Sequence, residues 1–174
     1  MNNLTSKENL PQMNKATTCI VRSLLPDEIC LLKDFLYEAI FIPEGVEPPS
    51  KDVVDLPELR VYIENFGQLK DDCCLVAVCD QKVVGAVWSR VMNDYGHIDD
   101  NTPSLSIALY GEYRNKGIGS RLMEEMITLL GRKGYDSVSL SVQKANYATR
   151  MYLKFGFKVV KETEEEYVMV KRLT

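Results

Sequence analysis

The chain has 174 residues, which suits a single domain that buries roughly two-thirds of the surface exposed by its unfolded form. Hydrophobic residues make up 45% and charged residues 26% of the chain, so the composition excludes an intrinsically disordered protein. The net charge is −4 and the basic residues are scattered, which argues against a surface that binds nucleic acid.

The beginning of the chain indicates no targeting or membrane segment. Residues 1–15 are mostly polar and lack the apolar region of a signal peptide, so we expect a flexible tail ahead of one domain at residues 16–174. The most apolar stretch, residues 30–42, is interrupted by charged residues and falls short of the roughly 20 residues that a membrane helix requires. We therefore expect a soluble, cytoplasmic protein without membrane contacts, either a monomer or a homodimer.

The cysteines predict neither cross-links nor a metal site. Their number is odd and no C-x-x-C pair occurs, which indicates neither a disulfide framework nor a zinc site. We expect small buried hydrophobic residues in a reducing compartment, and no bound metal. The five positions are Cys19, Cys30, Cys73, Cys74 and Cys79.

The first predicted elements are a strand and two helices. Residues 18–24 predict a strand, after which Pro26 and Asp27 supply the break and the N-cap of a helix. Prolines and a glycine within residues 41–55 predict an exposed loop. Apolar residues at helical spacing within residues 59–66 predict the second helix.

The later elements alternate between strands and helices. Residues 73–79 and 82–91 are apolar, β-branched runs joined by a short polar turn, which predicts an antiparallel hairpin. After it we expect a strand at residues 104–110, a helix at 118–130, a strand at 138–142, a helix at 145–154 and a last strand at 167–171. This order predicts an α/β (α+β) fold with a mixed, mostly antiparallel central sheet flanked by helices.

A glycine segment leads from a predicted strand directly into a predicted helix, at residues 113–121. Unpaired backbone N–H groups and the positive end of the helix dipole meet at a helix start, and glycines let a phosphate approach closely. The segment is not a P-loop, because Lys116 precedes Gly117, and it is not a Rossmann fingerprint, because Leu122 occupies the third glycine position. A tight turn whose glycines relieve steric crowding is the alternative.

Two blocks of this sequence resemble one family. Arg114, Gly117 and Gly119 form the pattern R-x-x-G-x-G, which resembles the signature of the GNAT superfamily of N-acetyltransferases. A second block, from Leu140 to Phe157, resembles that family's strand, helix and L/F-G-F ending. The resemblance implies a GNAT-like acyl-CoA N-acyltransferase fold from residue 18 to the C-terminus.

The resemblance also implies a cofactor, acetyl-coenzyme A. In this family the strand before the glycine segment splays from its neighbour and binds the pantetheine arm, while the glycine segment binds the pyrophosphate. One backbone N–H of that strand would polarise the thioester carbonyl, an interaction that contributes roughly 3 kcal/mol to catalysis. The implied cofactor-binding residues are Ile107, Ala108, Leu109, Arg114, Asn115, Lys116, Gly117, Ile118, Gly119, Ser120 and Asn146.

Tyr152 is the implied catalytic residue. It matches the tyrosine that protonates the departing coenzyme A thiolate in many family members, and a core aromatic at helical spacing is the alternative. The general base is left open, because many relatives carry a glutamate where Ser104 and Ser106 stand here. The candidates are His97, Asp99, Asp100 and a water ordered by Ser104 and Ser106.

The implied function is transfer of an acetyl group from acetyl-CoA to a primary amine of a small molecule or a peptide, by direct attack on the thioester. Glu38 and the loop at residues 41–55 stand where the family builds its acceptor pocket, and a carboxylate there could pair with an ammonium group. A solvated face is the other interpretation of Glu38. The missing carboxylate on the strand leaves a non-catalytic acyl-CoA sensing module as the alternative function, and acyl groups other than acetyl stay open.

Overall fold

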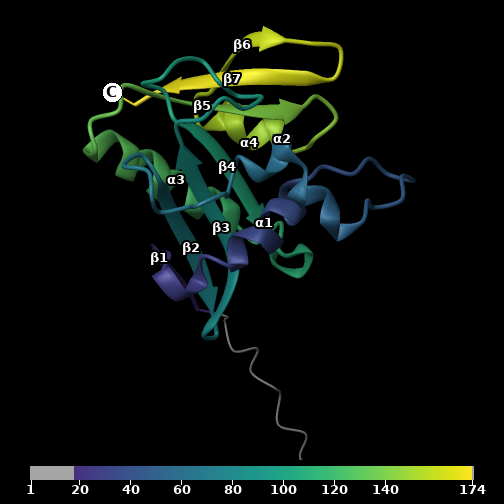
Figure 1. Cartoon of the computed structure of the whole chain (residues 1–174), viewed down its shortest axis with the longest axis vertical. Coiled ribbons are helices and arrows are strands. Elements are labelled where there is room, and N and C mark those ends of the chain that lie inside the picture. The colour runs from purple at the N-terminus through teal and green to yellow at the C-terminus, as the bar shows by residue number, and fades with distance from the viewer. Residues whose placement is uncertain (1–17, 174) are drawn as a thin grey trace, which may run out of the picture.

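The computed structural model describes residues 18–173, so the predicted tail at residues 1–15 lies outside the described residues. Its centre is a seven-stranded sheet with the strand order β1-β2-β3-β4-β5-β7-β6 (Figure 1). The strands are β1 (Cys19–Ser23), β2 (Cys73–Cys79), β3 (Lys82–Arg90), β4 (Ser104–Leu109), β5 (Ser137–Gln143), β6 (Lys158–Glu162) and β7 (Glu166–Arg172). Only β4 and β5 pair in parallel, which confirms the predicted mixed, mostly antiparallel sheet.

Helices cover both faces of this sheet. Figure 1 shows α1 on the near side of β3 and β4, with α3 behind the strands. The α-helices are α1 (Leu31–Ala39), α2 (Pro57–Arg60), α3 (Ile118–Arg132) and α4 (Thr149–Lys154), and the short 3-10 turns are η1 (Pro26–Glu28), η2 (Lys51–Asp55) and η3 (Gly111–Tyr113).

The sheet separates two buried clusters of side chains. Leu75 and Ala77 of β2 belong to one cluster with Met126 of α3, which we name the α3-side core. Val76 of the same strand belongs to the other cluster with Phe35 of α1, which we name the α1-side core. Because successive side chains of a strand point to opposite faces, β2 needs apolar residues at nearly every position.

The second predicted helix is shorter than the spacing of its apolar residues suggests. Only Pro57–Arg60 are α-helical, and residues 61–67 continue as turns. The buried guanidinium of Arg90 donates to the carbonyls of Val61 (2.8 Å) and Glu64 (2.9 Å), which a continuing helix would use for its own hydrogen bonds. A contact with β3 therefore overrides the local helical pattern.

Two other helix starts differ from the prediction. Asp27 does not cap the first helix, because Glu28 accepts the Leu25 N–H (3.0 Å) in η1 and α1 begins only at Leu31. The helix predicted from residue 145 begins at Thr149. Before it, residues 145–148 form a turn in which the Asn146 side chain accepts a backbone hydrogen bond, a common competitor of helix formation.

The prediction also missed β6 entirely. All five residues of this strand are exposed, so no alternation of buried and exposed side chains marks it in the sequence. It pairs only with β7 at the edge of the sheet, and its two lysines are typical of an edge strand that avoids further pairing.

The expectation of five buried, unlinked cysteines was wrong for three of them. Cys19 of β1 and Cys79 of β2 are direct cross-strand neighbours and form a disulfide, with Cα atoms 4.2 Å apart. Cys30 is exposed, whereas Cys73 and Cys74 are buried as expected, and burial raises the pKa of both thiols. The disulfide depends on the pairing register of β1 and β2, which the odd count and spacing of the cysteines do not reveal.

Within residues 18–173, none of the helices is long and apolar enough to cross a bilayer. The same residues contain no group of three or more His, Cys, Asp or Glu side chains placed to hold a metal ion.

Candidate active site

The parallel strands β4 and β5 separate almost as soon as they meet. Their register contains one pair, Ser104 with Ser139, and the Ser139 N–H donates to the Pro103 carbonyl (3.0 Å). Beyond this pair β5 continues only with β7, and Figure 1 shows β5 and β7 lying across the top of the view while β2, β3 and β4 run down it. The backbone of β4 after residue 105 therefore has an edge without a strand partner among the described residues.

Backbone alternation shows which groups of β4 face this gap. The Tyr110 N–H donates to Val84 of β3 (3.1 Å), and the Leu109 carbonyl points away from β3 and accepts from Arg114 (3.0 Å). Since N–H groups alternate along a strand, those of Ile107 and Leu109 face the gap, whereas that of Ala108 faces β3. Of the three strand residues predicted to bind pantetheine, Ile107 and Leu109 therefore present a backbone N–H to the gap. Ala108 does not.

The start of α3 offers three unpaired backbone donors. Gly117 is the N-cap, with φ of 80°, and it has no side chain to cap the helix. The first intrahelical hydrogen bond is from Arg121 N–H to the Gly117 carbonyl (3.1 Å), so the amides at positions 118–120 have no helical acceptor. A Cβ placed on Gly117 would meet no atom within 4 Å, so the space beside the N-cap residue is open. The arrangement fits an anion such as a diphosphate.

Two basic side chains near Gly117 contact β1 and a tyrosine ring rather than the start of α3. Arg121 donates to the Cys19 carbonyl of β1 (2.8 Å), and the Lys116 ammonium lies 5.6 Å from the centroid of the Tyr113 ring. Backbone amides, rather than a cluster of charges, therefore form the candidate anion site.

Arg114 joins β4 to α1. Its guanidinium donates to the Leu109 carbonyl and to the carboxylate of Glu38 at the end of α1 (2.8 Å), and also to the Glu38 carbonyl (3.1 Å). The Arg114 side chain and its backbone N–H, which donates to the Gly111 carbonyl (3.2 Å), thus both have partners, and its role in cofactor binding stays a prediction. Glu38 is partly exposed and is paired with Arg114 through Oε2, so its carboxylate is neither purely solvated nor without a partner.

Tyr152 of α4 is buried in the α3-side core. Its ring packs edge-on against Phe157, with centroids 5.9 Å apart, and burial raises the pKa of its phenol. The group therefore stays protonated at physiological pH, as a proton donor must be. Its catalytic role stays a prediction, because the core position alone also fits a structural aromatic.

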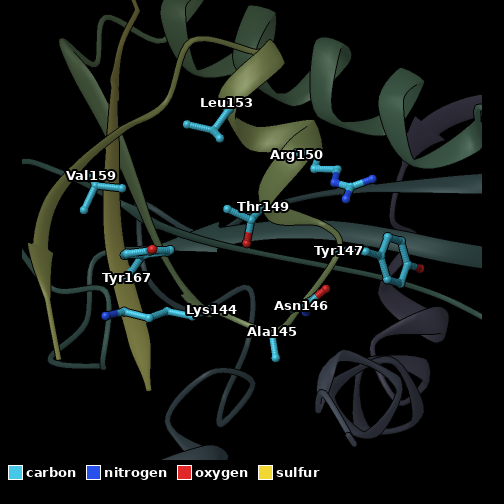
Figure 2. A pocket seen from close by; sticks show the side chains of 9 residues that line it. All are labelled: Lys144, Ala145, Asn146, Tyr147, Thr149, Arg150, Leu153, Val159 and Tyr167. Atoms are coloured by element: carbon cyan, nitrogen blue, oxygen red, sulfur yellow. The ribbon is translucent and has the colours of Figure 1, made fainter. Parts of the chain in front are cut away.

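The side-chain amide of Asn146 already makes one hydrogen bond with the backbone. Its Oδ1 accepts the Ala148 N–H (2.9 Å), which leaves the amide NH₂ and one lone pair of Oδ1 for a ligand. Asn146 also lies in a depression of about 490 Å³ on the outer side of α4, where Figure 2 shows Tyr147 and Tyr167 pointing to opposite sides. The depression is lined by Lys144, Ala145, Asn146, Tyr147, Thr149, Arg150, Leu153, Val159 and Tyr167. It shares only Asn146 with the predicted cofactor residues.

The base candidates named from the sequence have local roles. Asp99 is exposed and accepts the Asn101 N–H (2.9 Å), and this hydrogen bond lowers the pKa of the Asp99 carboxyl. Asp100 is exposed in the same turn. Nδ1 of His97 lies 2.9 Å from the Met92 carbonyl, which can only accept, so Nδ1 carries the proton and the ring is tied to its own loop.

Two residues near the separation of β4 and β5 were missed as site residues. Ser104 Oγ donates to Asp94 Oδ2 (2.6 Å), which makes Asp94 the carboxylate attached to the first residue of β4. Tyr62 is buried in the α1-side core, and burial and then the charge of Asp94 raise the pKa of its phenol. A single acid in a loop and a tyrosine at an apolar helical position carry no signal in one sequence.

Comparisons with known proteins agree with this architecture. A family model described as "Acetyltransferase (GNAT) family" matches residues 38–157. The chain is 33% identical over 136 residues to an N-alpha-acetyltransferase of Saccharolobus solfataricus, which covers 68% of this chain and 81% of that protein. It is 32% identical over 111 residues to a probable N-acetyltransferase camello of Xenopus tropicalis, which covers 62% of this chain and 46% of that protein. The chain thus spans less than half of the camello relative.

A solved structure shares the fold. The putative acetyltransferase YncA of Salmonella typhimurium with its cofactor acetyl-CoA superimposes with a TM-score of 0.67, covering 91% of this chain and 95% of that one. At 17% sequence identity, the likeness shows the arrangement of helices and strands alone.

Proposed function

Because the chain belongs to the GNAT family of acetyltransferases, we propose that it transfers an acetyl group from acetyl-CoA to a primary amine. The proposal rests on one observation: the site contains two sets of backbone N–H groups that have no hydrogen-bond acceptor in the described part of the chain. The amides at positions 118–120 open the helix α3, and those of Ile107 and Leu109 face the gap beside β4. A ligand with a diphosphate at one end and an amide-containing arm at the other matches both sets.

Each residue of this site has a role in the proposal. The amides of Ile118, Gly119 and Ser120 would bind the diphosphate, and those of Ile107 and Leu109 would bind the pantetheine arm. One of these β4 amides would also stabilise charge on the thioester oxygen during attack, as oxyanion-hole donors do. When bound, acetyl-CoA supplies the electrophilic acetyl carbon. Tyr152 would donate to the departing thiolate.

We further propose that the acceptor is the α-amine of a peptide. The support is the archaeal relative, an N-alpha-acetyltransferase of which this chain matches 81%. The chemistry is also favourable, since an α-amine has a pKa of about 7.7–8.0 against about 10.4 for a lysine side chain. A larger share of α-amine is therefore unprotonated and nucleophilic at neutral pH.

A thiol-release assay tests the proposal. The protein is mixed with acetyl-CoA and short peptides that begin with serine, alanine, threonine, glycine or methionine, and free thiol is followed over time. We expect release with a free α-amine and none with the same peptides acetylated in advance. Spermidine and a lysine peptide with a blocked N-terminus test small-molecule and side-chain amines. Tight acetyl-CoA binding without thiol release from any amine would instead favour a sensing module and reject the transferase.

A further inference from the structure

The loop between β3 and β4 is fixed over the point where β4 and β5 separate. Its Gly96 lies so close to both strands that a Cβ there would sit 2.6 Å from Ser104 Oγ and 3.1 Å from the Ser141 nitrogen. The His97 N–H donates to the Asp94 carbonyl (3.2 Å), which folds the loop into a turn. The loop therefore holds Asp94 at the narrow end of the gap.

The carboxylate of Asp94 is only half satisfied. Oδ2 accepts from Ser104 Oγ (2.6 Å), while Oδ1 is buried and has no hydrogen-bond partner within residues 18–173. Burying a carboxylate oxygen without a donor is unfavourable. Bulk water does not reach Oδ1, so a donor that enters the site would stabilise this carboxylate.

The groups around Asp94 lie on the α1 side of the sheet. Leu105 of β4 and Leu140 of β5 belong to the α3-side core, so the neighbouring side chains of Ser104 and Ser141 point to the opposite face. Tyr62 belongs to the α1-side core, and the charge of Asp94 contributes to the raised pKa of its phenol. Hydrogen bonding between the Tyr62 phenol and the Asp94 carboxylate also contributes to the raised pKa of Tyr62, yet Oδ1 has no hydrogen-bond partner of regular geometry within residues 18–173.

The two ends of the proposed proton transfer lie on opposite faces of the sheet. Tyr152 belongs to the α3-side core, whereas Asp94 is attached to Ser104 on the α1 side. The gap between β4 and β5 separates them. A thioester held in this gap would therefore have the phenol of Tyr152 on one face of the sheet and the carboxylate of Asp94 on the other.

The surface next to Asp94 is acidic and hollowed. A depression of about 510 Å³ is lined by Tyr95, Thr163, Glu164, Glu165 and Glu166. Tyr95 follows Asp94 in the chain, and the other residues belong to the turn between β6 and β7, apart from Glu166, which is the first residue of β7. Carboxylates at this position would attract an ammonium group towards the narrow end of the gap.

We propose that Asp94 accepts the proton of the attacking amine, and this inference rests on the proposed acetyl transfer. The amine nitrogen forms a bond to the acetyl carbon, and the proton released from that nitrogen passes to Oδ1 of Asp94. The carbon–sulfur bond breaks, and the thiolate takes a proton from Tyr152. The proton on Asp94 then leaves to solvent, and Tyr152 regains one, so the products are the amide and the free thiol.

Asp94→Asn tests the inference by removing the basic oxygen while keeping an acceptor for Ser104. We expect kcat for a serine-initiated peptide to fall about 100-fold, the usual size of a lost general base. The rise in melting temperature caused by acetyl-CoA should stay unchanged. Asp80→Asn, an exposed carboxylate in the β2–β3 turn, is the matched control and should keep wild-type kcat. Wild-type kcat in Asp94→Asn would overturn the inference.

Ser104→Ala separates proton transfer from support of the loop. It removes the hydrogen bond that Ser104 donates to Asp94 but keeps the carboxylate, so its kcat should fall less than tenfold. An equal fall in Ser104→Ala and Asp94→Asn would show that Asp94 serves only to hold the loop, and would also overturn the inference.

A binding measurement gives a readout without turnover. In the presence of CoA, the wild-type protein should bind the serine-initiated peptide at least tenfold more tightly than its acetylated form. Asp94→Asn should lose this preference, because the amine of the peptide can then no longer interact with a carboxylate at position 94. A preference retained in Asp94→Asn contradicts the inference. Thiol release absent from the wild-type protein would instead refute the proposed function, so the two failures are distinguishable.

Discussion

Tyr152 would combine a packing role with the proposed role of proton donor. Its ring packs in the α3-side core against Phe157, and the same burial raises the pKa of its hydroxyl. A phenol with a raised pKa is protonated at neutral pH, as the proposed transfer of a proton to the thiolate requires. Removing the hydroxyl should therefore affect catalysis and spare the packing.

We expect Tyr152→Phe to lower kcat about 100-fold, the scale of a lost general acid. The dissociation constant of acetyl-CoA should change less than threefold, because the site at α3 is intact. Steady-state thiol release and calorimetric titration measure the two quantities. An equal loss in kcat and in affinity would reject the acid role.

At the same scale, the sequence predicted residue positions better than it predicted their contacts. Gly117 does open α3, and Tyr152 does lie on the buried face of α4. The side chain of Arg114 could not be placed from the sequence, because its partner Glu38 is far away along the chain. Asp94 was missed for the same reason, since its importance depends on Ser104 and on the gap between β4 and β5.

Among the elements, the turn between β1 and η1 is held by an ion pair that also caps a backbone group. Arg22 and Glu28 make two hydrogen bonds of 2.7 Å, and Glu28 also accepts the Leu25 N–H. The hydrogen bond from Arg22 is the main cause that lowers the pKa of Glu28 to about 2. A carboxyl whose pKa is lower in the folded than in the unfolded protein stabilises the fold once it is ionised.

Glu28→Gln should therefore lower the free energy of unfolding by about 1 kcal/mol at pH 7. The stabilisation by Glu28 is complete above the unfolded pKa of about 4.3 and is lost as pH falls towards 2, so the two proteins should converge there. Urea unfolding at several pH values measures the difference. Glu64→Gln is the control, because its pair with Arg60 is about half exposed and should contribute little. A difference that is independent of pH would contradict the assignment.

Elements were predictable where a period of apolar residues coincides with burial. The strands β2 and β3 and the helix α3 have such a period, and all three were found near the predicted bounds. The strand β6 has no buried face, and the helix after Pro57 loses two carbonyls to Arg90, so local patterns failed at both. Tertiary contacts decided these elements, and one sequence does not contain them.

At the scale of the whole molecule, a buried ion pair ties the segment before β2 to the sheet. The guanidinium of Arg90 in β3 donates two hydrogen bonds of 2.9 Å to the Asp72 carboxylate. The two side chains are 4% and 1% exposed. Asp72 also accepts the N–H groups of Gly67 (2.6 Å) and Leu69 (3.3 Å). The pair thus fixes the segment that carries Tyr62 against the α1 side of the sheet.

Asp72→Asn should destabilise the protein by about 3 kcal/mol, because it leaves the Arg90 charge buried without a counter-ion. Urea unfolding measures the change. The control is Asp55→Asn, which breaks an ion pair with Lys33 whose side chains are about half exposed, and a change below about 1 kcal/mol is expected. Similar changes in the free energy of unfolding of both variants would show that the buried ion pair contributes no more than the exposed one.

The central claim is that the amides at the start of α3 bind the diphosphate of an acyl-CoA. A crystal structure of the complex with coenzyme A tests it most directly. We predict diphosphate oxygens about 3 Å from the amide nitrogens of Ile118, Gly119 and Ser120, with the pantetheine arm beside Ile107 and Leu109. Coenzyme A bound instead in the depression beside α4, with these amides free, would contradict the account.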